Sequence, residues 1–130
     1  MRELGRSRIE VSDIGMGCWA IGGPAYRGEI PIGWGEVDDR ESKRAIRAAI
    51  ASGITFFDTA DVYGAGRSER ILGEAISSDR DRVVIATKFS KLFEEESRQA
   101  AGSDQSPEYI KSACEASLRR LGTDHIDLYQ

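Results

Sequence analysis

Cysteine and histidine are scarce in this sequence, which has two cysteines, Cys18 and Cys114, and one histidine, His125. The cysteines lie far apart and show no metal-ligand spacing, so no metal site is expected. Two thiols also cannot form the set of disulfides that stabilises a small secreted domain, and we expect both to be free.

Long apolar runs are absent as well. Charged residues directly after Met1 interrupt the apolar core that a signal peptide requires, and no later segment is apolar enough to span a membrane. We therefore expect a cytoplasmic protein without membrane contact.

The chain also lacks an excess of positive charge. It carries 22 acidic and 18 basic residues, for a net charge of -4, and no basic stripe that could bind phosphates. This excludes nucleic acid as an expected partner. With 130 residues, 40% of them hydrophobic, the chain has room for one domain with a core of ordinary size.

Short apolar runs alternate with helical patterns along the chain, which indicates repeated βα units and a parallel sheet. Strands are predicted over 14–19, 55–58, 83–88 and 126–129. The two middle runs consist of bulky residues, as is typical of strands buried on both faces.

Three helices are predicted between these strands. The first starts near Asp39 as N-cap and ends at Gly53, the second starts at Ser68, and the third has Ser106 as N-cap with Pro107 at its first position. Their apolar stripes, expected to face the sheet, are Ala45, Ile46, Ala49 and Ile50; Ile71, Leu72, Ala75 and Ile76; and Ile110, Ala113, Cys114, Leu118 and Leu121.

Three further segments lie outside these units. Residues 3–5 and 8–11 flank a glycine-containing turn and predict a short hairpin that could close one end of a barrel. Residues 22–37 and 89–105 are expected to be long loops, which usually are functional lids or disordered segments.

The length of the repeating unit favours a barrel. An eight-unit barrel of about 250 residues allots about 31 residues to each unit, and the second and third predicted strands start 28 residues apart, at Thr55 and Val83. The run GMGCWA at 15–20 lacks the third glycine of a dinucleotide-binding Rossmann turn. We predict an α/β fold, a parallel (β/α)₈ TIM barrel, of which residues 14–130 form the N-terminal half, with 1–13 as the leading hairpin.

Polar side chains end the two central strands. Asp58 ends the second and Lys88 the third, so the acid and the base should meet at the C-terminal face, where barrel enzymes keep their active sites. Tyr63 follows five residues after Asp58, and its hydroxyl is expected to contact the Lys88 ammonium. A neighbouring cation favours the phenolate and so makes tyrosine a better proton donor.

The sequence around these residues resembles the signature of the aldo-keto reductase family. The matching segments, in order, are FFDTADVYG at 56–64, GRSE at 66–69, LG at 72–73, ATK at 86–88 and LRRLGTD at 118–124. The resemblance implies a (β/α)₈ barrel that binds NADP(H) and reduces small aldehydes or ketones to alcohols. It implies that Tyr63 protonates the carbonyl oxygen, and that Lys88 and Asp58 tune the acidity of the Tyr63 hydroxyl.

The resemblance also implies where the cofactor binds. Gly17, Cys18 and Trp19, together with Asp58, match positions at the nicotinamide end of the cofactor, although threonine is often found in place of Cys18. By the same analogy, aromatic side chains of the first long loop are expected either to rim the substrate pocket or to have a packing role. These are Tyr26 and Trp34.

Part of the family pattern is missing. The family's fourth catalytic residue is a histidine just after the strand matched by 126–130, whereas His125 precedes this strand, at the opposite end of the barrel, and is expected to be structural. Strands five to eight and the phosphate-binding loops are also absent. We expect weak cofactor binding and a chain that self-associates through the open half-barrel or is partly unfolded.

Three interpretations remain open. The chain is a truncated part of an oxidoreductase, inactive alone; or a non-catalytic aldo-keto-reductase-like scaffold or binding module; or an unrelated half-barrel that self-assembles. The retained Asp58, Tyr63 and Lys88 do not separate the first two, because a scaffold can keep them.

Overall fold

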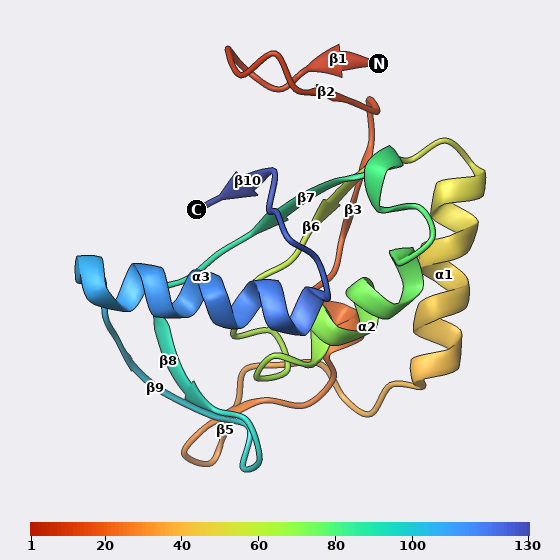
Figure 1. Cartoon of the computed structure of the whole chain (residues 1–130). Helices are drawn as coiled ribbons and strands as arrows, with labels where there is room; N and C mark the ends of the chain where they lie inside the picture. Colours follow the sequence, from red (N-terminus) through yellow and green to blue (C-terminus); the bar gives the residue numbers. More distant parts are fainter.

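The computed structural model describes all residues from Met1 to Gln130. Its centre is a four-stranded parallel sheet in the order β10-β7-β6-β3. The strands are β3 (Gly15–Gly17), β6 (Phe56–Asp58), β7 (Val84–Thr87) and β10 (Leu128–Tyr129). Helices cover one face of this sheet (Figure 1), and they are α1 (Asp39–Ala51), α2 (Arg67–Ile76) and α3 (Pro107–Leu121).

The predicted alternation of strands and helices is confirmed. Each of these parallel strands pairs with the next parallel strand along the chain, as in a (β/α) barrel, and each is shorter than predicted because only part of the predicted segment pairs. None of the three helices has the length and apolar composition that crossing a membrane requires.

The helix ends follow the predicted capping with small shifts. Asp38, one residue before the predicted Asp39, caps α1 by accepting hydrogen bonds from the N–H groups of Arg40 and Glu41 at 2.7 and 3.0 Å. The Ser106 side chain caps α3 as predicted. An N-cap of this kind stabilises a helix by about 1 kcal/mol.

The core lies between the sheet and the helices. Phe57 of β6, Ile85 of β7, Ile46 of α1 and Leu72 of α2 are fully buried in one hydrophobic cluster. Each such side chain stabilises the fold by about 1.5–3 kcal/mol. The predicted stripe of α2 is buried throughout, which confirms this helix as the central one of the layer.

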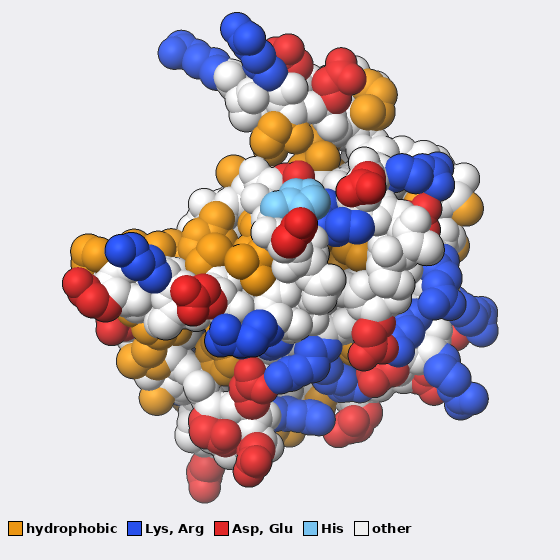
Figure 2. Space-filling view, viewed as in Figure 1, with side chains coloured by type: hydrophobic (Ala, Val, Ile, Leu, Met, Phe, Trp, Pro, Cys, Tyr) orange, Lys and Arg blue, Asp and Glu red, His pale blue; other side chains and the backbone are white.

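The stripes of the outer helices are less buried than expected. Ala45 of α1 is exposed, and Ile110, Cys114 and Leu118 of α3 are only half-buried. On α3 the reason is that β10 is the edge of the sheet, so no further strand or helix packs beyond it. Figure 2 shows hydrophobic side chains gathered between the N-terminal hairpin and α3, over this edge.

The predicted N-terminal hairpin forms. Strands β1 (Arg2–Glu3) and β2 (Glu10–Val11) pair antiparallel. Paired hydrogen bonds of 2.8 and 2.9 Å between Ser12 and Thr55 attach its end to the start of β6. The hairpin therefore lies where the parallel strands begin, at the end opposite to Asp58 (Figure 1).

The two segments expected to be unstructured loops instead form a second sheet, in the order β5-β4-β9-β8. Its strands are β4 (Tyr26–Arg27), β5 (Ile30–Pro31), β8 (Lys91–Glu94) and β9 (Gln99–Ser103). The expectation was wrong because the order comes from pairing between the segments: Tyr26 pairs with Gln99, and the Gln99 amide bonds both the N–H and the carbonyl of Gly28. This sheet lies beyond the C-terminal ends of the parallel strands (Figure 1).

Gly73 of α2 tests the close approach of α2 to α3. A Cβ at this position would lie 2.2 Å from the carbonyl oxygen of Leu121. Glycine to alanine normally stabilises a helix by about 1 kcal/mol, but here the backbone of α3 must move, at a cost of about 1–3 kcal/mol. We predict that Gly73→Ala lowers the urea midpoint of unfolding.

Gly35→Ala is the matched control, because a Cβ there meets nothing within 4 Å. It should leave the midpoint unchanged or raise it. Equal midpoints for the two variants would contradict the described packing of α2 on α3.

Candidate active site

Lys88 and Asp58 meet at the C-terminal ends of neighbouring strands, as predicted. The Lys88 Nζ donates to Asp58 Oδ1 and Oδ2, both at 2.8 Å, and to the backbone carbonyl of Thr59 at 2.7 Å. Both side chains are about one-third exposed. The ammonium has three N–H donors, and these three acceptors can take all of them, so the lysine is fixed in position.

Tyr63 lies beside this pair, but through its ring and not its hydroxyl. The Lys88 Nζ is 5.2 Å from the centre of the Tyr63 ring, within the range of cation–π attraction. The predicted contact between the hydroxyl and the ammonium does not form, because Asp58 and Thr59 already occupy the donors of Lys88.

The loop that carries Tyr63 is held close to the chain after β3. Gly64 has a φ of +60°, and a Cβ on it would lie 1.9 Å from the carbonyl oxygen of Gly22. Only glycine fits both the left-handed backbone and this close approach. The N–H of Ser68 also bonds the Tyr63 carbonyl at 3.2 Å, so the backbone of Tyr63 is supported on both sides.

An exposed aromatic group borders Tyr63. The Trp19 ring is 6.3 Å from the Tyr63 ring and 5.7 Å from the Trp34 ring, which it meets edge to face. Trp19 and Trp34 are 46% and 52% exposed. Tyr26, the other predicted rim residue, lies in β4 of the second sheet and makes no ring contact with them.

The predicted cofactor residues divide between the surface and the core. Gly17 is exposed and pairs with Asp58, and Trp19 lies beside Tyr63. The Cys18 side chain is fully buried in the core cluster, and burial raises the pKa of its thiol to about 12. Because this side chain is buried, only the backbone of Cys18 is available for the predicted contact with the cofactor, and that contact stays a prediction.

A buried carboxyl lies on the other side of the same loop. Asp61 is 2% exposed, and its Oδ1 has no hydrogen-bond partner. Burial, and secondly the charge of Glu69, raise the pKa of Asp61 to about 7. The sequence did not single out Asp61, because nothing in the spacing around it shows that this carboxyl is buried.

Glu69 joins three elements below this loop. This fully buried carboxylate accepts from Thr87 Oγ1 and from Arg120 Nε, both at 2.6 Å, and Arg120 reaches on to Glu95 at 3.1 Å. The network links α2, β7 and α3. A buried charge of this kind is tolerated because it is paired and hydrogen-bonded.

A second buried contact ties the strand ends to α2. The hydroxyls of Thr59 and Ser68 lie 2.9 Å apart, and the Ser68 hydroxyl donates to the Cys18 carbonyl at 2.7 Å. Thr59 directly follows Asp58, and Cys18 directly precedes Trp19, so these bonds fix the backbone next to both site residues. Their role explains the GRSE segment, which the sequence identified only by resemblance.

His125 occupies the position predicted for it. It precedes β10, is exposed, and its Nδ1 lies 2.7 Å from Asp124. This is the end of the sheet at which the strands begin, away from Lys88.

The sequence that forms this site matches a known protein family. The model of the aldo/keto reductase family matches residues 13–130. The chain belongs to this family. Aldo-keto reductase YhdN from Bacillus subtilis is 43% identical over 94% of this chain and 34% of its own length. Probable aldo-keto reductase 1 from Glycine max is 39% identical over 98% of this chain and 34% of its own length.

Solved structures of aldo-keto reductases superpose on this chain. The holo form of AKR11C1 from Bacillus halodurans superposes with a TM-score of 0.83 at 36% identity, over 99% of this chain and 38% of that chain. An aldo-keto reductase from Klebsiella pneumoniae in complex with NADPH gives a TM-score of 0.66 at 33% identity, over 92% of this chain and 34% of that chain.

These relatives are TIM barrels, so the parallel sheet is the N-terminal part of a (β/α)₈ barrel. The chain spans about a third of the length of the curated relatives it matches.

The buried Asp61 predicts a pH dependence of stability. Folding raises the pKa of this carboxyl from its ordinary value of 3.8 to about 7, so its contribution to stability is complete below pH 3.8 and is lost as the pH rises through 7. Asp61→Asn removes this dependence. The melting temperature of the variant relative to the native chain should therefore be higher at pH 8 than at pH 5, by roughly 4 °C or more.

Asp81→Asn is the control, because it removes an exposed carboxylate of the turn at Arg80–Arg82. Its melting temperature should follow that of the native chain at both pH values. An Asp61→Asn difference that does not change with pH would contradict a proton bound at Asp61.

Proposed function

We propose that the protein carrying this chain is an NADP(H)-dependent oxidoreductase that reduces aldehydes or ketones to alcohols. The observation that carries the proposal is the Lys88 ammonium, held by Asp58 and the Thr59 carbonyl and lying 5.2 Å from the Tyr63 ring. The Klebsiella pneumoniae relative in complex with NADPH supports the choice of cofactor.

In this proposal Tyr63 is the proton donor. As a hydride reaches the carbonyl carbon, the electron pair of the C=O bond moves to oxygen, and the oxygen takes the proton of the Tyr63 hydroxyl. The nearby Lys88 charge stabilises the phenolate that remains. Asp58 is a positioning residue in this step, because it holds Lys88 and touches no reacting atom.

The residues around Asp58 fit the nicotinamide end of NADP(H). A side chain at Gly17 would meet nothing within 4 Å, and Trp19 is 46% exposed, so an open surface with an aromatic wall borders Tyr63. A flat ring fits such a surface. Gly17, Trp19 and Asp58 would hold the nicotinamide, which when bound supplies a hydride.

The 130-residue chain is proposed to be inactive by itself. Its relatives are about three times as long, and the other strands of the barrel would complete both the cofactor site and the catalytic set. The half-buried residues along β10 and α3 offer the isolated chain a surface for self-association (Figure 2). A chain that sediments as a monomer in ultracentrifugation and melts cooperatively in calorimetry would contradict this association.

Tyr63→Phe tests the proposed chemistry. Loss of the proton donor should lower kcat for a small aldehyde by about 10²- to 10⁴-fold in the natural full-length protein. NADPH affinity, followed by nicotinamide fluorescence, should stay within about twofold, because the ring and its contact with Trp19 remain.

Tyr129→Phe is the matched control, because the Tyr129 hydroxyl is buried without a hydrogen-bond partner on the helix side of the sheet. Its kcat should equal that of the native protein. Full activity of Tyr63→Phe would refute the role of Tyr63, and binding of NADPH without any turnover by the native protein would favour a non-catalytic scaffold.

A further inference from the structure

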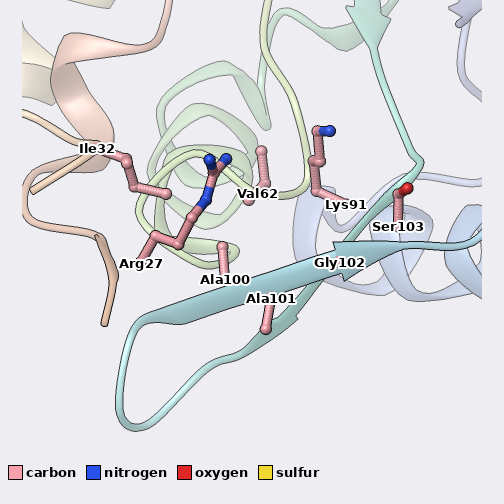
Figure 3. Close-up of a pocket in the computed structure, with 8 residues that line it drawn as sticks. All are labelled: Arg27, Ile32, Val62, Lys91, Ala100, Ala101, Gly102 and Ser103. Carbon is pink, nitrogen blue, oxygen red and sulfur yellow. The ribbon is translucent and has the colours of Figure 1, made fainter. Parts of the chain in front are cut away.

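A cavity of about 450 Å³ opens beside the loop that carries Tyr63. Arg27 of β4, Lys91 of β8, Ser103 of β9 and Val62 line it, together with Ile32 and residues 100–102. In Figure 3 the Arg27 guanidinium and the Lys91 ammonium lie on either side of Val62, above strand β9. The cavity thus belongs to the second sheet, whose strands the sequence did not predict.

The charge of this cavity is opposite to that of the chain. The chain has a net charge of -4, yet the lining includes two basic side chains and no acidic one. Neither Arg27 nor Lys91 takes part in an ion pair. Two unpaired cations on one concave surface favour an anionic ligand, and the arginine fork matches the oxygen pairs of carboxylates and phosphates.

The backbone under both cations is fixed before any ligand binds. The strand of Arg27 is joined to β9 by the hydrogen bond from Tyr26 to the Arg98 carbonyl, 2.9 Å, and by the Gln99 amide. The Lys91 carbonyl accepts from the Tyr109 hydroxyl at 3.1 Å. Two segments more than 60 residues apart in sequence are thereby held on one sheet, which limits the entropy lost on binding.

The cavity is also next to the proposed chemistry. Val62, which lines it, directly precedes Tyr63, so their Cα atoms are about 3.8 Å apart. The N–H of Asp61 bonds the Lys88 carbonyl at 3.1 Å, which ties this loop to the end of β7. Tyr63 itself does not line the cavity, so a ligand held between Arg27 and Lys91 has to extend past Val62 to bring a carbonyl group to the tyrosine.

We infer that this cavity binds the anionic end, a carboxylate or a phosphate, of a carbonyl substrate whose reacting group lies at Tyr63. This inference rests on the proposed reductase function and narrows its substrate class. Arg27 and Lys91 determine specificity, because they bind the part of the substrate that does not react.

Paired substrates test the inference in the natural full-length protein. The carboxylate pair is 4-oxobutanoate and its methyl ester, and the phosphate pair is glyceraldehyde 3-phosphate and glyceraldehyde. For at least one pair, the anionic member should have a kcat/KM at least about tenfold higher. Arg27→Gln with Lys91→Met should abolish that preference by raising KM for the anionic member, with little change for the neutral one.

Arg47→Gln with Lys111→Met is the matched control. These exposed side chains of α1 and α3 form no ion pair and lie outside the cavity, and their loss removes the same charge from the chain. The control should keep the native preference. An equal loss in the two double variants would assign the effect to net charge and overturn the inference, as would a native protein without preference in either pair.

Binding measurements separate failure of this site from failure of the reductase function. If no carbonyl compound is reduced, titration with succinate and with inorganic phosphate still tests the cavity through the NMR shifts of Ser103 and the Arg27 Nε–H. Saturable shifts that the Arg27→Lys variant weakens and the Arg27→Gln variant abolishes would support the anion site, and their absence from the native protein would overturn it. The single variants also serve if the double variant does not fold.

Discussion

The site depends on one ion pair, in which the ammonium of Lys88 is held by both carboxylate oxygens of Asp58 and by the Thr59 carbonyl. The pair exists because β6 and β7 are parallel neighbours, so the side chains that end them meet at one edge of the sheet. Opposite charge and hydrogen bonds replace the water that a half-buried ion pair loses. The Tyr63 ring lies next to this cation, and the role proposed for the tyrosine depends on the charge of Lys88.

Strand alternation places a second polar layer directly behind the first. Asp58 and Lys88 face the interior of the barrel, whereas Thr59 and Thr87, their neighbours in sequence, face the helices. Thr87 bonds Glu69, so the helix layer holds the same strand ends that present the ion pair. The family motif therefore combines the Asp58–Lys88 ion pair on one side of the sheet with a hydrogen-bonded support on the other.

Most of the parallel sheet could be predicted because its signals are local. Apolar runs, the serine cap at Ser106 and the position of Asp58 and Lys88 at strand ends all lie within short segments of sequence. The second sheet could not be predicted, since Tyr26 and Gln99 pair across 73 residues and neither segment has a strong strand pattern. The cavity between Arg27 and Lys91 depends on that pairing and was missed with it.

Two details of the site needed side-chain geometry. The sequence predicted that Tyr63 lies near Lys88, but it could not show which part of the tyrosine makes the contact. That depends on how many acceptors already surround the ammonium. Likewise, the burial of Cys18 and Asp61 depends on which side of the sheet each faces, and the segment Gly15-Met16-Gly17 before Cys18 has no polar residue from which to judge it.

The most direct test of the central claim is hydride transfer itself. The natural full-length protein would be supplied with NADPH deuterated at C4 of the nicotinamide and with an aldehyde, and the product alcohol would be analysed by mass spectrometry. We expect one deuterium on the former carbonyl carbon, and formation of this labelled alcohol about 10²- to 10⁴-fold slower when Lys88 is replaced by methionine. Binding of NADPH without any labelled alcohol from the native protein would contradict it.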